Sequence, residues 1–249
     1  MRKVIRLIVV DVDDTILCKG SGITPRTLAA WEACGAAGAL RCIATGRVRQ
    51  AVPPLGQDYS ICHGATLVLE GVQPLLRSTL SPTQVSHLWG WAGARGVDAV
   101  FFAEDAWSAN FEGEHTAGLT RFLGCAPGGE PACEVPLAKF RTTGVELAVD
   151  FPDLWVTPEG EWTYVRRTCT DKGTALKLLL EHLGLARDQV ICFGDDLADL
   201  PMFPLCGHAV AVGNGHPDLL AAATRIAPPA SEDGVAQVLE EMLALGLIG

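Results

Sequence analysis

The stretch VIRLIVVDVDDT, residues 4–15, decides the fold, because a short apolar run leads directly into a group of acids. Residues 4–10 show no alternation of polar and apolar side chains, which is typical of a parallel strand covered on both faces. Similar runs occur at residues 40–44, 59–62, 189–193 and 209–212. This pattern predicts a mainly parallel sheet that begins with residues 4–10.

Helical signals separate these runs. Thr24 followed by Pro25 predicts a helix N-cap with a proline in the first turn. A second helix is expected to open near residues 170–171 and to end at Gly184, and a third to start at Ser231. Alternating strands and helices predict an α/β fold with an open, doubly wound, mainly parallel sheet.

The middle of the chain, residues 78–166, follows a different pattern. It starts with a helix-like stretch at residues 83–94, and hairpin-like pieces follow at residues 97–104, 144–151 and 161–167. Five of the six tryptophans lie here, and we expect most of them in the core of a small domain. We therefore expect an α/β core of residues 1–77 and 167–249, with an inserted α+β cap domain at 78–166.

The composition excludes several classes of protein. Of the 249 residues 49% are hydrophobic, too many for a disordered chain. The early apolar run is far shorter than the ~20 residues of a membrane span, so no membrane partner is expected. The net charge is −10 and no basic run stands out, which argues against a nucleic-acid partner. The nine cysteines form no C-x-x-C pair and predict reduced thiols in a cytoplasmic protein.

Acidic side chains follow two of the predicted strands. Asp11 and Asp13 follow the first, and the sequence GDDLADL, with Asp195, Asp196 and Asp199, follows a later one. Because the carboxyl ends of parallel strands meet at one edge of a sheet, we expect the two groups to lie together. Carboxylate oxygens suit Mg²⁺, which keeps waters and substrate phosphate as its other ligands. The sequence therefore predicts a magnesium site.

Other polar residues also lie directly after a predicted strand or at the start of a predicted helix. Thr45, Gly46 and Arg47 come after the second predicted strand, and Lys172 opens a later helix. A hydroxyl, a lysine, a divalent ion and several acids together are typical of phosphoryl transfer, because they offset the negative charge of the phosphate. The sequence GNG at residues 213–215 lacks a third glycine, and we interpret it as a turn.

These motifs resemble those of haloacid dehalogenase superfamily phosphatases, in particular the Cof-type group with its large type IIB cap. DVDDT resembles the first motif, TGR the second, DKGTAL the lysine motif and GDDLAD the fourth. The resemblance implies a Rossmann-like core and a Mg²⁺-dependent phosphatase that acts on a small phosphorylated metabolite, such as a sugar phosphate.

The resemblance also implies roles for individual residues. Asp11 would be the nucleophile that forms an aspartyl-phosphate, and Asp13 the general acid and then the base. Thr45 and Lys172, with the neighbouring Gly46 and Arg47, would bind the phosphoryl group.

For the metal, the resemblance implies Asp11, the Asp13 carbonyl and Asp195, with Asp196 and Asp199 as alternative or outer ligands. Two positions depart from the pattern of the group: Ala198 replaces an Asn of the fourth motif, and His63 replaces the Asn of an N-G-A sequence.

Other interpretations stay open. Asp195 and Asp199 could cap a helix, Thr45 could be an N-cap, and Arg47 could be a surface charge. At the level of function, the alternatives are a sugar phosphomutase that uses the same acids and a non-catalytic phosphate-binding or phosphorylation-switch protein. A receiver-like switch is disfavoured, because it would carry its phosphoacceptor on a middle strand, whereas Asp11 follows the first.

Overall fold

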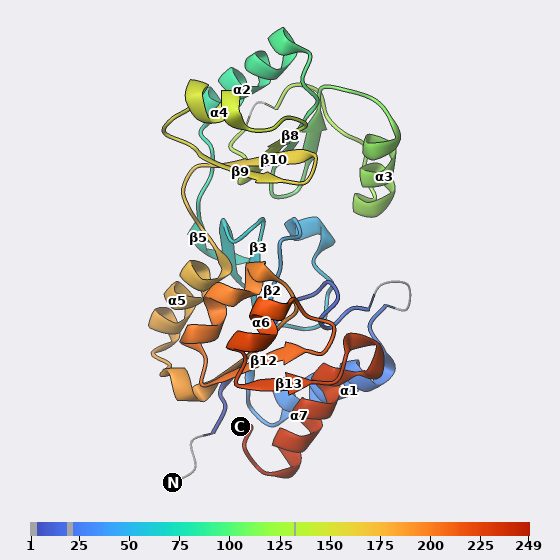
Figure 1. The fold of residues 1–249 in the computed structure, drawn as a ribbon, viewed down its shortest axis with the longest axis vertical. Helices are drawn as coiled ribbons and strands as arrows, with labels where there is room; N and C mark the ends of the chain where they lie inside the picture. The colour runs from blue at the N-terminus through green and yellow to red at the C-terminus, as the bar shows by residue number, and fades with distance from the viewer. Residues whose placement is uncertain (1–3, 19–21, 132) are drawn as a thin grey trace. The chain divides into compact units, whose positions relative to one another are not determined.

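The computed structural model describes residues 4–18, 22–131 and 133–249. The chain divides into two compact units, whose elements are shown in Figure 1. Unit 1 comprises Met1–Gly46, Pro53–Leu75 and Asp171–Gly249, and unit 2 comprises Arg47–Val52 and Leu76–Thr170. The expected α/β core with an inserted α+β part is confirmed.

Unit 1 is built on a sheet with the strand order β13-β12-β11-β1-β2-β3-β4-β5. The strands from β13 to β3 are parallel, and β4 is antiparallel to β3. The bounds are β1 Leu7–Val10, β2 Leu40–Ala44, β3 Tyr59–Cys62, β4 Leu67–Glu70, β5 Gln73–Arg77, β11 Val190–Gly194, β12 His208–Val212 and β13 Arg225–Ala227. Strands β1 and β11 are wholly buried, as their continuous apolar sequences predict.

Helices connect the parallel strands of unit 1. They are α1 Pro25–Ala36, α5 Lys172–Leu183, α6 Pro217–Ala222 and α7 Gly234–Ala244, with the 3₁₀ segments η2 Arg187–Gln189, η3 Leu197–Leu205 and η4 Ala230–Glu232. The Thr24 hydroxyl accepts a hydrogen bond from the Thr27 backbone N–H and caps α1 as expected. The last helix begins at Gly234 rather than at Ser231, which lies in η4.

Unit 2 contains an antiparallel sheet with the order β7-β6-β8-β10-β9. The strands are β6 Ala99–Phe102, β7 Trp107–Ala109, β8 Leu137–Phe140, β9 Trp155–Glu159 and β10 Trp162–Arg166. The helical segments are η1 Arg49–Ala51, α2 Pro82–Arg95, α3 Glu114–Leu123 and α4 Val145–Asp150. The hairpin expected at 144–151 is therefore wrong: Gly144, with a φ of 83°, starts a helix that buries Leu147.

Two apolar clusters form the core of unit 2. One contains Trp91, Phe101 and Phe140. The other contains Trp107 and Trp162, together with Val48, and it explains why residues 47–52 pack with unit 2 and not with the core in which the sequence had placed them. Most of the tryptophans are thus core residues, but Trp155 is 45% exposed.

In the described parts of the chain, no helix is both long enough and apolar enough to cross a membrane.

Candidate active site

The pairing of β1 with β11 brings the two acidic groups together. The strands are parallel neighbours, and Val10 is paired with Phe193. Asp11 continues this register, since its backbone N–H donates to the Phe193 carbonyl at 3.1 Å. Asp11 and Asp195, which follow the two strands closely, therefore lie at the same edge of the sheet.

Three carboxylates meet there. Asp11, Asp195 and Asp199 each offer one oxygen, and these oxygens all lie within 4.8 Å of one another. Asp11 is 6% exposed and Asp199 is 1% exposed, whereas Asp195 is half-buried. The Thr15 hydroxyl donates to Asp195 Oδ1 at 2.8 Å and orients that carboxylate.

Lys172 supplies the positive charge of this group. It is the first residue of α5, whose start is capped by Asp171, and its side chain is buried. Its Nζ donates to Asp11 Oδ1 and to Asp199 Oδ1, both at 2.6 Å. One ammonium group therefore bridges two buried carboxylates, and each hydrogen bond is assisted by charge.

Asp199 holds the site together through both of its oxygens. While Oδ1 accepts from Lys172, Oδ2 accepts from the backbone N–H groups of Asp195 at 3.0 Å and Asp196 at 3.2 Å. A Cβ atom on Gly194 would lie 2.5 Å from the Asp199 Cβ, so only glycine allows this approach. The sequence suggested Asp199 only as a metal ligand or a cap, and its bond to Lys172 was missed.

The burial of these charges shifts their pKa values. Burial raises the pKa of Asp11 to about 7; Lys172 opposes this rise, and Asp199 and Asp195 add to it. Burial also raises the pKa of Asp195 to about 6, against the opposing hydrogen bond from Thr15. Burial alone would lower the pKa of Lys172, but Asp11 and Asp199 hold it above its usual value.

This group of residues fits a divalent cation. The donors are hard carboxylate oxygens, the ligand type that Mg²⁺ prefers. Burial is the main cause of the raised pKa values of Asp11 and Asp195, and repulsion by the Asp199 carboxylate adds to both. A divalent cation at this position would relieve that repulsion.

Asp13 and Thr45 lie on the loops beside this group. Asp13 is exposed, in a tight turn where Asp14 adopts a φ of 55° and its N–H donates to the Leu17 carbonyl. Thr45 is buried directly after β2, the neighbour of β1. Gly46 follows, and a Cβ there would meet no described atom within 4 Å, so no close contact demands glycine.

Arg47 and Asp196, which were predicted for the site, form hydrogen bonds and ring contacts within their own segments or with unit 2. Arg47 belongs to unit 2, where its guanidinium lies 5.3 Å from the centre of the Phe122 ring and donates to the Ala51 carbonyl. Asp196 is exposed and caps η3, since its Oδ1 accepts from the Leu197 N–H at 2.7 Å. Among the described residues, Asp196 is not one of the three carboxylates that meet there.

Asn214 connects two segments of unit 1 in a way that the sequence does not predict. Its Nδ2 donates to the Asp14 carbonyl and its Oδ1 accepts from the Ala230 N–H, both at 2.8 Å. It thereby ties the loop after β1 to the segment that leads into α7. The sequence shows an asparagine between two glycines after a buried strand, a pattern that predicts a turn but not these two hydrogen bonds.

The two departures from the motif pattern differ in burial. Ala198 lies exposed in η3, on the solvent side of the turn that holds Asp199. His63 is fully buried after β3, with a φ of 53°, and its carbonyl accepts from the Thr66 hydroxyl at 2.8 Å.

Comparison with known proteins gives a family and several relatives. A family model described as haloacid dehalogenase-like hydrolase matches residues 8–121 and 153–239. A putative bifunctional phosphatase/peptidyl-prolyl cis-trans isomerase of Streptococcus pyogenes is 28% identical, over 99% of this chain and 55% of the relative. A phosphoglycolate phosphatase of Methanothrix thermoacetophila is 31% identical, over 46% of this chain and 50% of the relative. The chain thus spans about half the length of these curated relatives.

Solved structures share the fold. A haloacid dehalogenase-like hydrolase from Bacteroides thetaiotaomicron has a TM-score of 0.87 at 20% identity, over 96% of this chain and 99% of that one. A sugar phosphatase of HAD subclass IIB has a TM-score of 0.79 at 22% identity, over 98% of this chain and all of that one.

Proposed function

Because the chain belongs to the family of haloacid dehalogenase-like hydrolases, we propose that it is a Mg²⁺-dependent phosphatase that hydrolyses small phosphomonoesters through an aspartyl-phosphate on Asp11. The observation that carries this proposal is the buried Asp11 carboxylate, held by Lys172 at 2.6 Å within a group of three acids. The relatives named as phosphatases support the class of reaction.

The metal would be held by the carboxylates of Asp11 and Asp195, with the Asp13 carbonyl as a further ligand. Asp199 would be an outer ligand of the metal, since both of its oxygens already accept hydrogen bonds. A bound Mg²⁺ supplies positive charge that lets an anionic nucleophile approach an anionic phosphate.

Each side chain has its own role in the proposed hydrolysis. Asp11 attacks phosphorus, and the bond to the leaving alcohol breaks as Asp13 donates a proton to its oxygen. Asp13 then takes a proton from the water that hydrolyses the aspartyl-phosphate. Lys172 favours the ionised form of Asp11 and, with the Thr45 hydroxyl, stabilises the phosphoryl oxygens. The substrate is a small phosphorylated metabolite.

The test uses Asp11→Asn, which keeps the size of the side chain but removes the nucleophile. We expect release of phosphate from p-nitrophenyl phosphate in MgCl₂ to fall about a thousandfold or more, while thermal unfolding shows a folded protein. Asp218→Asn, at an exposed acid of α6, is the matched control and should keep full activity.

Removal of the metal provides a second arm of the test. A chelator should abolish the activity of the wild-type protein, and added Mg²⁺ should restore it. Hydrolysis by folded Asp11→Asn protein at the wild-type rate would refute the assignment of the nucleophile.

A further inference from the structure

The loop between β12 and α6 contacts both of the acidic loops of the candidate site. The Asn214 Nδ2 donates to the Asp14 carbonyl at 2.8 Å, in the loop after β1. Two residues later, the His216 backbone N–H donates to the Asp195 carbonyl at 2.6 Å, in the loop after β11. A Cβ on Gly215 would lie 3.1 Å from the same carbonyl oxygen, so this residue also lies close to Asp195. All of these residues belong to unit 1.

The turn that carries Asp13 has a backbone that needs support. Asp14, the next residue, adopts a φ of 55°, a left-handed conformation that is uncommon in residues other than glycine. Its N–H donates to the Leu17 carbonyl, and the Leu17 N–H donates to the Val12 carbonyl, both at 2.8 Å. A conformation of this kind persists only where its surroundings hold it. The hydrogen bond from Asn214 is such a constraint, and it comes from outside the turn.

The carbonyl that Asn214 binds lies between two residues of the site. It belongs to the peptide unit that joins Asp14 to Thr15, and Asp13 directly precedes Asp14. The Thr15 hydroxyl donates to Asp195 Oδ1 at 2.8 Å. The Asn214 amide therefore fixes the backbone between Asp13, the proposed general acid, and Thr15.

The other half of the Asn214 amide is anchored to a packed segment. Its Oδ1 accepts from the N–H of Ala230, which is buried and begins η4. Gly213 lies against the same segment, since a Cβ there would be 3.2 Å from the Ala227 carbonyl oxygen. A primary amide can bridge two backbones in this way because it carries both donors and an acceptor. Asn214 thus connects the turn of Asp13 to a fixed part of unit 1.

We propose that Asn214 is a positioning residue that holds Asp13 where it can protonate the leaving group. This inference rests on the proposed function. In that reaction Asp11 bonds to phosphorus, the bond from phosphorus to the alcohol oxygen breaks, and the Asp13 proton passes to that oxygen. Asp13 is exposed, so its position depends strongly on the backbone of the turn. A displacement of about 1 Å can slow such a step about a hundredfold.

The experiment compares two phosphomonoesters of similar size, with the full-length protein in saturating MgCl₂. p-Nitrophenyl phosphate releases a weakly basic phenolate, which leaves without a proton, whereas benzyl phosphate releases an alkoxide, which needs one. The parameter is kcat/KM, because it covers the steps up to departure of the alcohol and leaves out hydrolysis of the aspartyl-phosphate. We expect Asn214→Ala to lower kcat/KM for benzyl phosphate about tenfold or more beyond its effect on p-nitrophenyl phosphate.

Thr224→Ala is the matched control. The Thr224 hydroxyl accepts from the Ala209 N–H and donates to the Ala209 carbonyl, both at 2.9 Å. Ala209 lies near the start of β12, at the opposite end of this strand from the loop that carries Asn214. Each variant loses two hydrogen bonds to backbone groups of unit 1, so thermal unfolding should shift by a similar amount. Only Asn214→Ala should change the ratio of the two substrates.

Each outcome decides the proposal. An equal fall for both substrates, or no fall, in folded Asn214→Ala protein overturns it, and so does the same change of ratio in Thr224→Ala. A wild-type protein that cleaves p-nitrophenyl phosphate but not benzyl phosphate also overturns it, because no general acid then assists the leaving group. If Asn214→Ala does not fold, Asn214→Ser takes its place.

Failure of the proposed function is recognised separately. If the wild-type protein leaves both substrates intact, the chain is not the phosphatase proposed above. Amide hydrogen exchange of residues 12–17 then tests whether Asn214 holds the turn. Exchange that is faster in Asn214→Ala than in the wild-type protein and in Thr224→Ala supports this role, and equal exchange overturns it.

Discussion

Lys172 is the residue on which the charge balance of the candidate site depends. It is the ammonium group that links Asp11 to Asp199, and all three side chains are buried. Two carboxylates at this depth would repel each other without a cation between them. The same residue therefore offsets the repulsion between the two carboxylates and favours the ionised form of Asp11.

At this scale we predict how stability depends on pH without metal. The pKa of Asp11 rises from 3.8 to about 7 on folding, so the folded state binds this proton more tightly than the unfolded state. The resulting stabilisation is complete at low pH and is lost as the pH rises from about 4 to about 7. In a chelator, the free energy of unfolding in urea should fall over this range by on the order of 3 kcal/mol.

The control for this prediction is Asp11→Asn, whose side chain does not titrate and whose profile should be flatter. Added Mg²⁺ should flatten the wild-type profile as well. Equal slopes for the chelated wild-type protein and the variant would show that Asp11 does not titrate in this range.

At the scale of elements, the packing of α5 on η3 positions the site. Gly173, the second residue of α5, lies against the backbone of Pro201 in η3, and a Cβ at this glycine would collide with the Pro201 carbonyl. The neighbours of this contact are Lys172 on one element and Asp199 on the other. Close approach of the two elements is therefore what permits the bond between Lys172 and Asp199.

Gly173→Ala should push the two elements apart. We expect a loss of about 1–3 kcal/mol of stability from overpacking, and a fall in kcat/KM of about a hundredfold from the misplaced Lys172. Gly90→Ala is the matched control, because Gly90 is also a helical glycine but its Cβ would meet no described atom within 4 Å. That variant should be unchanged or more stable by up to ~1 kcal/mol. Similar behaviour of the two variants would contradict this account.

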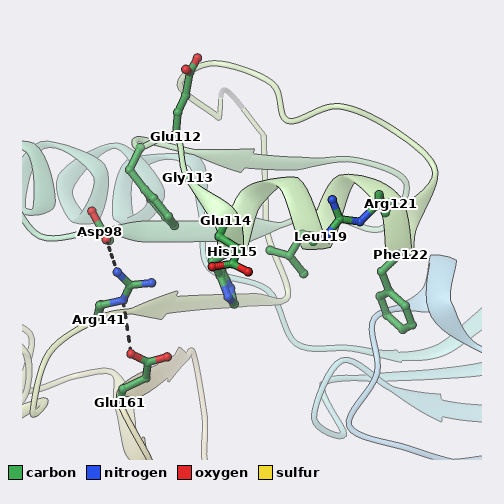
Figure 2. Close-up of a pocket in the computed structure, with 12 residues that line it drawn as sticks. Asp98, Glu112, Gly113, Glu114, His115, Leu119, Arg121, Phe122, Arg141 and Glu161 are labelled. Carbon is green, nitrogen blue, oxygen red and sulfur yellow. Dashed lines mark hydrogen bonds and ion pairs between the residues drawn. The ribbon is translucent and has the colours of Figure 1, made fainter. Parts of the chain in front are cut away.

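At the scale of the whole molecule, the chemical groups of the candidate site and a pocket beside the start of α3 belong to different units. Asp11, Thr45, Lys172 and Asp195 lie in unit 1, whereas the pocket, of about 760 Å³ and shown in Figure 2, is lined by residues of unit 2. Within unit 2, Glu104 forms ion pairs with Arg49 at 3.4 Å and with Arg77 at 2.6 Å. On the proposed function, we expect unit 2 to select the substrate and unit 1 to carry out the hydrolysis.

Replacing residues 78–166 with a short linker tests this division. The core should still hydrolyse p-nitrophenyl phosphate but lose its preference among metabolites. Val48 packs in an apolar cluster of unit 2, so the truncated protein should also carry Val48→Ser to limit aggregation. Circular dichroism must first show that it folds. A folded core that ranks substrates as the full chain does would place specificity in unit 1.

Much of the fold could be predicted because its signals are local. The buried strands β1 and β11 are continuous apolar runs, and α1 and α5 carry their capping residues in sequence. The rule that parallel strands share a carboxyl edge then brought Asp11 and Asp195 together, although 184 positions separate them. The helix α4 was missed because a six-residue element has too few turns to show its period.

The sequence by itself determined which residues lie at the ends of the strands, because the acids directly follow the apolar runs along the chain. Only the tertiary structure decided what those residues touch. The double use of Asp199, the place of Arg47 in unit 2 and the bond from Asn214 to the Asp14 carbonyl each depend on segments packed from elsewhere in the chain. Tertiary packing decides whether a charged side chain is buried and which partner it contacts. A local sequence pattern cannot predict either.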